Sequence, residues 1–325
     1  QRQMCIRDRI EAACRANNHV LDYGTTGLAE TLENLHRGGI RTLGAGLTEE
    51  QAWAPLTLEL GGARLSLVNF CEGEDLSAAR GGPGVAGWEI PRVCALIRAL
   101  KARGDCVVVV AHAGLEYVPF PPPYLQRALR AVLDAGADAV AAHHAHVPQG
   151  IEIYRERPIA YCLGNFLFYQ PTDLHWRKVG YLLELELAGG GLRSFRTHPY
   201  SITDAGLCAP GPEGEADFRR ALVGISAPLA EAGGCERAWE AYLQYYGAAG
   251  LRQELEGIVE ALRTEPPKGA AMLRNRLTTP QHAELWRDLL RRLVDGGPEP
   301  PLELTRIVAE WFERRERPAQ AVGIP

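Results

Sequence analysis

The chain has 325 residues, of which 46% are hydrophobic and 23% are charged. This is ordinary globular composition, and the length suffices for one large domain together with a smaller one. The net charge of −5 gives no electrostatic reason to expect a nucleic-acid partner, and no apolar run approaches the roughly 20 residues that a membrane helix needs.

The first nine residues, QRQMCIRDR, do not begin with methionine. They resemble the adapter-derived runs found at the ends of fragmentary translated reads, so we expect residues 1–9 to be a sequencing artefact. The alternative is an ordinary basic start of a helix. On the artefact interpretation, the absence of a signal peptide at this end says nothing about the native protein.

From about residue 10 to residue 200, short apolar runs alternate with amphipathic stretches, which is typical of βαβ units around a buried sheet. The run EAACRAN predicts a short strand over 11–17, and a helix over 26–37 with a strand over 40–46 follows. The sequence LTLELGGARLSLVNF predicts a β-hairpin over 56–70, because both flanks alternate and Gly61 and Gly62 supply the turn.

Two similar helix–strand units come next. The first unit has a predicted helix over 91–104, followed by the buried strand CVVVVA. The second has a predicted helix over 121–136, followed by the short strand ADAVAA. Both strands end in histidine. A strand with an internal turn is then expected over 158–168 and a closing hairpin over 181–200, so we place the α/β domain at residues 10–204.

Beyond this point all the patterned segments have a helical period. Helices are predicted over 217–232, 236–247, 251–263, 282–294 and 302–315. The Trp and Tyr residues fall on the apolar stripes, which predicts core or docking contacts. Residues 205–325 therefore form a helical domain, which could cap an active site, dimerise or dock a partner.

Histidines follow the ends of several predicted strands. His112 follows CVVVVA, the sequence AAHHAHVPQG follows the next strand, and Asn18 and His19 follow the first. In open α/β sheets ligands bind beyond the carboxyl ends of the strands, so three chain segments should bring imidazoles to one edge of one sheet.

The HxH pair is the centre of this cluster. Side chains two positions apart on an extended chain point the same way, so His144 and His146 should converge while His143 faces oppositely. With His112, Glu116 and the Asn18–His19–Asp22 segment they form a nitrogen and oxygen donor set, which suits Zn²⁺, Mn²⁺ or Fe²⁺. A structural role is the alternative for any lone strand-end histidine, and it is the role that we assign to four others: His36, His175, His198 and His282.

The motifs NNHVLDYG, HAGLEY, HHAHVPQG and LGNFLF occur in this order between residues 10 and 200. Together they closely resemble the CapA family of capsule and poly-γ-glutamate synthesis proteins, a branch of the calcineurin-like metallophosphoesterase superfamily. The resemblance implies a four-layer α/β/β/α sandwich that holds two metal ions, followed here by the helical domain.

Roles for single residues follow from the same resemblance. It implies metal ligands at four positions: Asn18, His112, His144 and His146. His19 would lie over the transferred group with support from Asp22, and Glu116 would lie beside the metal. His143 and Asn165 would belong to the substrate pocket.

The family pattern begins with two acidic motifs, Gly-Asp and Asn-Leu-Glu, that have no counterpart here. We therefore expect a domain that lacks its N-terminal strands, and a two-metal site only in the intact protein, with weak or single metal binding by this chain. A natural variant with one metal is the alternative. Four smaller departures from the family, none at a ligand, are Ala113, Ala142, Ala145 and Cys162.

The resemblance favours a metal-dependent hydrolase of phosphoester or related bonds in capsule or poly-γ-glutamate synthesis. The partners would be an anionic polymer or phosphoester substrate and a polymer-synthase complex. One alternative is a non-catalytic subunit that binds polymer or assembles the synthase, and another is a broad phosphodiesterase. Scattered cysteines without CxxC pairs predict buried reduced thiols, which favours a cytosolic location. Members of the family, in contrast, are often anchored to the membrane and face the outside of the cell.

Overall fold

The computed structural model describes residues 10–73 and 78–316. The predicted artefact at residues 1–9 lies outside the described residues. Within the described ranges the seven cysteines are all unpaired, and no helix is long and apolar enough to cross a membrane.

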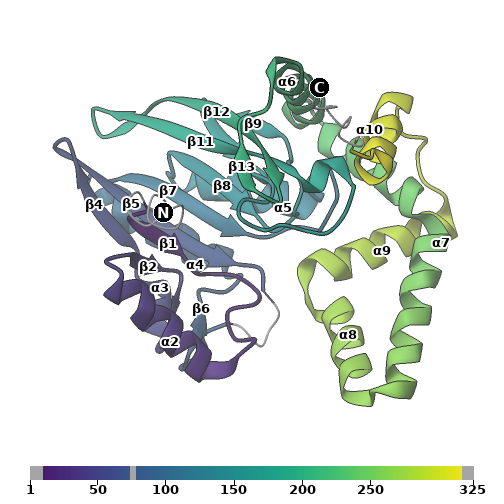
Figure 1. Cartoon of the computed structure of the whole chain (residues 1–325), viewed down its shortest axis with the longest axis horizontal. Helices are drawn as coiled ribbons and strands as arrows, with labels where there is room; N and C mark the ends of the chain where they lie inside the picture. Colours follow the sequence, from purple (N-terminus) through teal and green to yellow (C-terminus); the bar gives the residue numbers. More distant parts are fainter. Residues whose placement is uncertain (1–9, 74–77, 317–325) are drawn as a thin grey trace, which may run out of the picture.

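A six-stranded sheet forms the centre of the molecule, with the strand order β4-β5-β7-β8-β10-β9 (Figure 1). The strands are β4 (Leu56–Leu60), β5 (Ala63–Cys71), β7 (Cys106–His112), β8 (Ala139–His143), β9 (Ile151–Tyr154) and β10 (Arg157–Ala160). The four middle strands are parallel, and the two edge strands are antiparallel to their neighbours. The parallel strands therefore deliver their carboxyl ends to one edge of the sheet.

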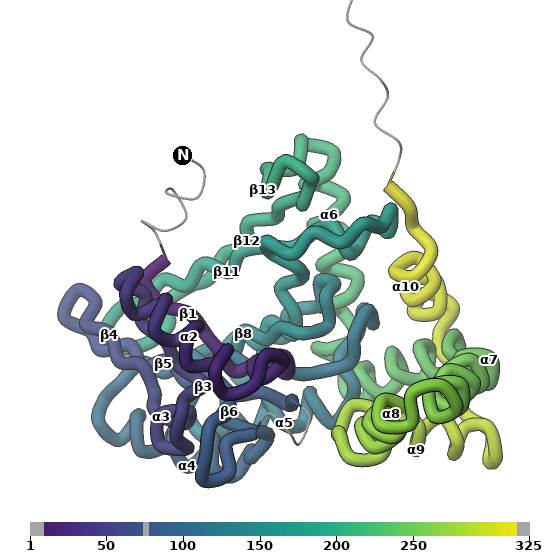
Figure 2. The backbone as a smooth tube through the Cα atoms, turned by 60° about the horizontal axis from the view of Figure 1, so that its bottom comes forward, coloured from purple at the N-terminus to yellow at the C-terminus, as the bar shows by residue number. Residues whose placement is uncertain are grey.

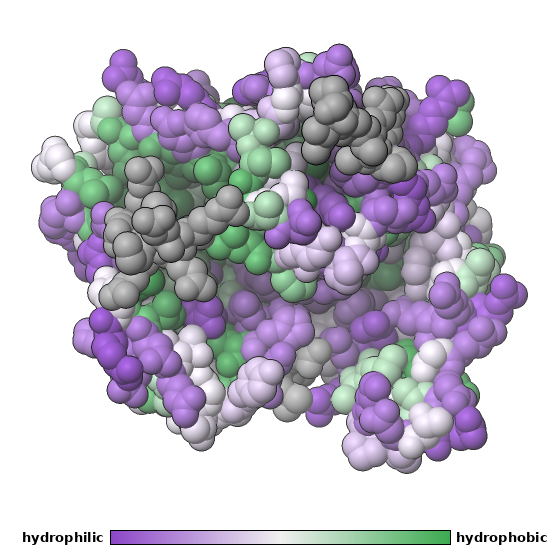
Figure 3. All heavy atoms as spheres, in the orientation of Figure 1, coloured by the Kyte–Doolittle hydropathy of each residue, from purple (hydrophilic) through white to green (hydrophobic). Residues whose placement is uncertain are grey.

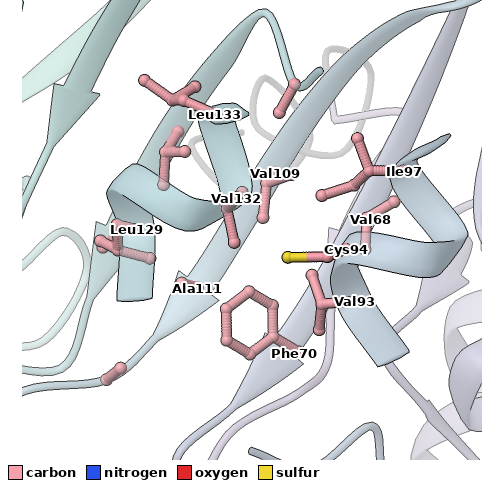
Figure 4. Close-up of a cluster of buried hydrophobic side chains, with 14 of the residues drawn as sticks. Val68, Phe70, Val93, Cys94, Ile97, Val109, Ala111, Leu129, Val132 and Leu133 are labelled. Carbon is pink, nitrogen blue, oxygen red and sulfur yellow. The ribbon is translucent and has the colours of Figure 1, made fainter. Parts of the chain in front are cut away.

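Helices α4 (Ile90–Ala102) and α5 (Pro123–Asp134) lie side by side on one face of this sheet. Their inward residues interlock with those of β5 and β7, as Figure 4 shows for Val93, Ile97, Val132, Phe70 and Val109. All five are buried. These two helices confirm the predictions over 91–104 and 121–136. The predicted hairpin over 56–70 is also confirmed, with positive φ at both Gly61 and Gly62.

A second sheet contains β11 (Val179–Ala188), β12 (Gly191–Thr203) and β13 (Gly206–Cys208). Its hairpin confirms the prediction over 181–200. β12 contacts β7 from the face opposite the helices, and Figure 3 shows apolar side chains beside the hairpin. Several apolar residues that face this space, among them Val110 and Leu183, are only half-buried.

The N-terminal elements pack beside β4 and β5 (Figure 1). They are β1 (Ala12–Cys14), α2 (Gly24–Arg37), β2 (Arg41–Leu43), β3 (Ala45–Gly46), α3 (Glu49–Trp53) and β6 (Gly84–Val85). β1 pairs in parallel with β2, and β3 pairs antiparallel with β6. The strand predicted over 40–46 is thus split in two at Gly44.

The helical region contains α6 (Pro212–Ser226), α7 (Gly234–Thr264), α8 (Pro266–Thr278), α9 (Pro280–Asp295) and α10 (Leu302–Glu313). α7 joins two predicted helices across a kink at Gly247, where φ is 54° and ψ is −170°. α8 is a helix that the sequence did not predict, since two prolines at its start look like a break. They are tolerated because the first helical turn needs no backbone N–H donors there. Figure 2 shows α8 and α9 together at the lower right, next to α7.

The helical region shares a core with the α/β part. Trp239, Tyr242 and Trp311 are buried, which confirms the predicted core role for these three residues, whereas Tyr245 is exposed. The rings of Trp311 and Trp176 stack with their centroids 3.9 Å apart, and Trp311 Nε1 donates to the Pro148 carbonyl at 3.3 Å. The mixed α/β class with layered sheets, helices and a C-terminal helical region is confirmed.

One predicted strand is shorter than expected. The run over 158–168 is a strand only to Ala160, and the residues that follow make isolated bridges at Leu163 and Gly164. Gly164 has a φ of +83°, which a strand cannot accommodate. The LGNF segment is therefore an irregular loop that leads back to β11.

Candidate functional site

A pocket of about 230 Å³ lies beyond the carboxyl ends of β5, β7 and β8. Its walls come from five parts of the chain. The lining residues are Asn18, His19, Glu72, Gly73, His112, Leu115, Glu116, His144, Asn275, Arg276, Gln281 and His282. Five of the predicted site residues are among them, which places the predicted strand-end cluster at one pocket.

His112 is the last residue of β7, and its ring lies between two other predicted ligands. Its Nε2 atom is 3.0 Å from the Asn18 Oδ1 atom, and its ring centroid is 4.8 Å from that of His144. Ligand atoms on one ion with bonds of about 2.1 Å lie about 3.0–3.4 Å apart, depending on whether the coordination is octahedral or tetrahedral. The Asn18–His112 separation therefore fits two ligands of one ion.

The loop that carries Asn18 and His19 is fixed to the sheet by Asn69. This buried side chain accepts a hydrogen bond from the Ala16 backbone N–H at 2.8 Å and donates to the Val110 carbonyl at 3.0 Å. Gly44 leaves room for it, since a Cβ atom at this position would lie 2.0 Å from the Asn69 Oδ1 atom. Asn69 thus sets the distance between the Asn18 loop and β7.

His144 and His146 converge, but not for the reason that the sequence suggested. β8 ends at His143, and both later histidines have positive φ, 107° and 58°. The prediction of an extended chain at this point is therefore wrong. Non-glycine residues are rarely held in this region, and such strain is concentrated at functional sites.

Glu116, His144 and His146 form a possible metal-binding triad. Each offers a donor atom, and these atoms lie within 4.8 Å of one another. The His146 Nε2 atom is 3.9 Å from the Glu116 Oε1 atom. Two imidazoles and one carboxylate suit a divalent transition metal.

Asn165 determines which nitrogen of His146 is free. Its amide group donates to the carbonyls of His146 and Arg177, at 3.1 and 3.0 Å. Its Oδ1 atom must then be the acceptor that lies 2.7 Å from His146 Nδ1. The proton of His146 consequently sits on Nδ1, and the Nε2 lone pair faces Glu116.

Burial keeps the strand-end imidazoles neutral. It holds the pKa of His112 well below its usual value and lowers the pKa of His144 to about 3 and that of His143 to about 4. A neutral imidazole is the form that binds a metal. The His144 Nδ1 atom is buried without a hydrogen-bond partner among the described residues, so the side chains present fit a cation.

His19 and Asp22 form a hydrogen-bonded pair at the mouth of the pocket. The His19 Nδ1 atom is 3.0 Å from the Asp22 Oδ2 atom, and the His19 Nε2 atom is 3.4 Å from Asn18 Nδ2. Because the carboxylate can only accept, it fixes the His19 proton on Nδ1. The pair therefore has the arrangement of an oriented proton-transfer group.

His143 and Asn165, which were predicted as pocket residues, do not line the pocket. His143 pairs with His112 in the strand register, and Asn165 acts through His146. Arg276 and His282 lie in the pocket instead. The prediction that His282 is apart from the site is wrong, because the start of α9 packs against the strand edge, which no local pattern reveals.

Glu72 is a further pocket residue that the sequence did not single out. Its carboxyl group is buried and accepts hydrogen bonds from the Tyr124 hydroxyl at 2.5 Å and the Gly114 N–H at 2.9 Å. The Gln281 backbone N–H faces the same carboxyl group and favours its ionised form. Burial raises the pKa of Glu72 to about 8. Its position directly after β5 was a signal that could have identified it.

Comparison with known proteins places the chain among capsule synthesis proteins. It is 32% identical over 195 residues to "PGA biosynthesis protein CapA" of Bacillus subtilis (strain 168), which covers 58% of this chain and 50% of that protein. It is 30% identical over 161 residues to "Capsule biosynthesis protein CapA" of Bacillus anthracis, covering 48% and 39%. A match to "Probable polyglutamine synthesis accessory protein MT0602" of Mycobacterium tuberculosis (strain CDC 1551 / Oshkosh) is 33% identical over 216 residues, covering 60% and 56%.

Among solved structures, one match is a 5'-nucleotidase precursor from Thermus thermophilus. It has a TM-score of 0.40 and 16% identity, and it covers 70% of this chain and 46% of that one. The chain spans about half the length of the curated relatives that it matches. The family model described as "Bacterial capsule synthesis protein PGA_cap" matches residues 6–170, half of the chain, and the protein therefore belongs to this family.

Proposed function

We propose that this protein is a metal-dependent hydrolase that acts on phosphoester or related acyl bonds during the synthesis of an anionic capsule polymer. The observation that carries the proposal is the set of donor atoms at the strand ends, with the Glu116–His144–His146 triad beside the Asn18–His112 pair. The description of the family and the names of its relatives support the polymer as the context.

Five side chains would hold the cation, which we propose to be Mn²⁺, Zn²⁺ or Fe²⁺. They are Asn18, His112, Glu116, His144 and His146. A divalent cation at this position supplies a Lewis acid and lowers the pKa of water.

The chain's own groups would then perform the proton transfer. Asp22 orients His19, so that the His19 Nε2 atom can take a proton from, or return one to, a reacting oxygen. Asn165 holds the His146 ring in the orientation in which Nε2 faces the donor cluster. Because these groups are fixed before substrate binds, little reorganisation is needed during the reaction.

The test is metal binding and hydrolysis by the His144→Ala variant. We expect Mn²⁺ affinity, measured by calorimetry, to fall at least tenfold and hydrolysis of bis-p-nitrophenyl phosphate to be lost. His198→Ala is the matched control, since His198 lies on β12, contacts Glu184 of β11 and does not line the pocket. Hydrolysis that EDTA does not inhibit, or that survives in the His144 variant, would contradict the proposal.

A second candidate is a non-catalytic subunit that binds polymer or assembles the synthase, which the name "accessory protein" of one relative favours. His19→Ala distinguishes the two, because His19 is outside the proposed ligand set. For an enzyme we expect metal binding to persist while hydrolysis falls about a hundredfold. If metal content and polymer output both survive this change, the accessory role is the better account.

A further inference from the structure

We propose that the corner between α8 and α9 is the substrate-recognition wall of the pocket, and that Arg276 binds the anionic end group of the substrate, a phosphate or a carboxylate. This inference rests on the proposed function, because it takes the pocket beside the candidate metal ligands as the place where substrate binds. It concerns a region outside residues 6–170, the segment that matches the family.

The corner is placed against the strand ends by specific contacts. α8 ends at Thr278 and α9 begins at Pro280, and residues on both sides of this corner line the pocket together with His144. The Gln281 backbone N–H faces the buried Glu72 carboxyl group. Further along α9, Glu284 pairs with Arg127 of α5 at 3.4 Å. The helical wall is therefore held to the α/β part at two points.

Arg276 is fixed in position by two side chains of the helical region. Its Nε atom donates to Glu254 Oε1, and its Nη1 atom is 3.2 Å from His282 Nε2. The other oxygen of Glu254 accepts from Tyr246 and Trp286, each at 2.8 Å. Among the described residues nothing accepts a hydrogen bond from the Arg276 Nη2 group. A guanidinium ion held in this way is prepared to bind an oxyanion.

The charge of the pocket lining supports an anionic ligand. Arg276 is the only lysine or arginine among the residues that line the pocket in the described chain. Glu254 faces Arg276 from behind and is absent from the lining. Glu116 is the one acidic side chain at the opposite wall with substantial exposure, 42%. The Arg276 guanidinium is therefore the cationic group through which the described lining can bind an anion, and it lies on the helical side.

Unsatisfied polar groups around Arg276 indicate that the ligand also makes hydrogen bonds there. The Gln281 side chain is 8% exposed, and among the described residues its Oε1 atom has no partner, nor has the Nδ1 atom of His282. Buried polar groups usually have partners. A volume of about 230 Å³ is below the roughly 300–1,000 Å³ of pockets that enclose a whole small molecule, so an end group or one repeating unit is the ligand that fits.

The test is calorimetric binding of two probes, inorganic phosphate and γ-glutamyl-glutamate, to the full chain in EDTA. We expect the wild-type protein to bind at least one of them and Arg276→Met to bind it at least tenfold more weakly. Binding of phosphate alone identifies a phosphoryl end group, and binding of the dipeptide alone identifies a carboxylate. Arg274→Met, an exposed change two residues away on α8, should leave the affinity unchanged.

Glu254→Gln separates a binding role from a structural one. It disrupts the same ion pair as Arg276→Met, so the losses of stability on thermal unfolding should be similar, but it leaves the guanidinium in the pocket. We expect it to keep probe affinity within about threefold, given the modest value of such pairs. The inference is overturned if neither probe binds, if Arg276→Met binds as wild type does, or if both variants lose affinity equally.

The result of this binding test does not depend on whether the protein hydrolyses a substrate. Probe binding that depends on Arg276, in a protein that shows no metal-dependent turnover, would retain this inference and remove the proposed function. Metal-dependent turnover with an unchanged KM in Arg276→Met would retain the proposed function and remove this inference.

Discussion

The strand-end wall and the helical wall of the pocket differ in how their polar side chains are fixed. On the strand-end wall, Asn69 and Asn165 hold the functional groups through hydrogen bonds to backbone atoms, and His144 has an uncommon backbone conformation. On the helical wall, Arg276 is held by the side chains of Glu254 and His282.

This difference indicates which wall can change with the smaller loss of stability. Backbone-anchored groups are part of the folded core, so altering them costs stability as well as geometry. The Arg276–Glu254 pair, in which the side chains are 19% and 18% exposed, is made by side chains alone, so both partners can be exchanged together without changing a backbone contact. The family match covers the first wall and not the second, which is consistent with shared chemistry on one side and recognition particular to this chain on the other.

The contact between the two walls at Glu72 should give the largest effect. The pKa of Glu72 is raised to about 8 by burial, while an unfolded glutamate has a pKa of about 4.3. The folded state therefore holds the Glu72 proton more tightly than the unfolded state does. The resulting stabilisation of the folded state is fully present below the pKa of the unfolded glutamate, and it is lost as the pH rises through 8. Relative to Glu72→Gln, the wild-type free energy of unfolding should fall by about 4 kcal/mol between pH 5 and pH 9.

Urea unfolding of both proteins across this pH range measures the difference. Glutamine keeps the acceptor for Tyr124 and Gly114 and removes the titration. Parallel pH profiles for the two proteins would show that Glu72 is ionised in the fold and that the walls do not meet through a protonated carboxyl group.

Gly44→Ala should break the strand-end wall alone. The new Cβ atom would lie 2.0 Å from Asn69 Oδ1, in a residue whose φ is +86°. Strain at positive φ and the collision with a buried side chain together should cost about 3 kcal/mol, measured by urea unfolding. Mn²⁺ affinity should fall as well, because Asn69 positions the Asn18 loop.

Gly61→Ala is the matched control, since Gly61 also has positive φ but no atom lies within 4 Å of a Cβ built there. It should cost about 1 kcal/mol. Equal losses in the two variants would mean that Asn69 does not require the space that Gly44 leaves.

Asn165→Ala should give the smallest effect and sharpen the comparison. It removes the acceptor that holds the His146 proton on Nδ1, so Mn²⁺ affinity should fall about tenfold, equivalent to about 1.4 kcal/mol. Asn165→Asp keeps an acceptor and should retain more of the affinity in the same calorimetric titration. A larger loss with aspartate than with alanine would show that the two carbonyl contacts of Asn165 matter more than its contact with His146.

Most of the α/β elements could be predicted from sequence because each carries its own signal. Alternation with paired glycines predicts the hairpin of β4 and β5, and a run of four valines predicts the buried strand β7. The candidate ligands could be predicted for the same reason, since parallel strands bring their carboxyl ends to one edge and His112 and His144 follow such ends. These are consequences of local pattern and of one topological rule.

The tertiary structure alone decided the rest. α8 begins with Pro266 and Pro267 and has no strong local signal, and Arg276 and His282 reach the pocket only because α9 packs against residues more than a hundred positions away. His144 and His146 converge through left-handed backbone conformations that side-chain alternation does not predict. The sequence determined which residues offer metal-binding chemistry, and long-range packing decided what faces them across the pocket, because a local period specifies which face of an element is apolar but not which partner covers it.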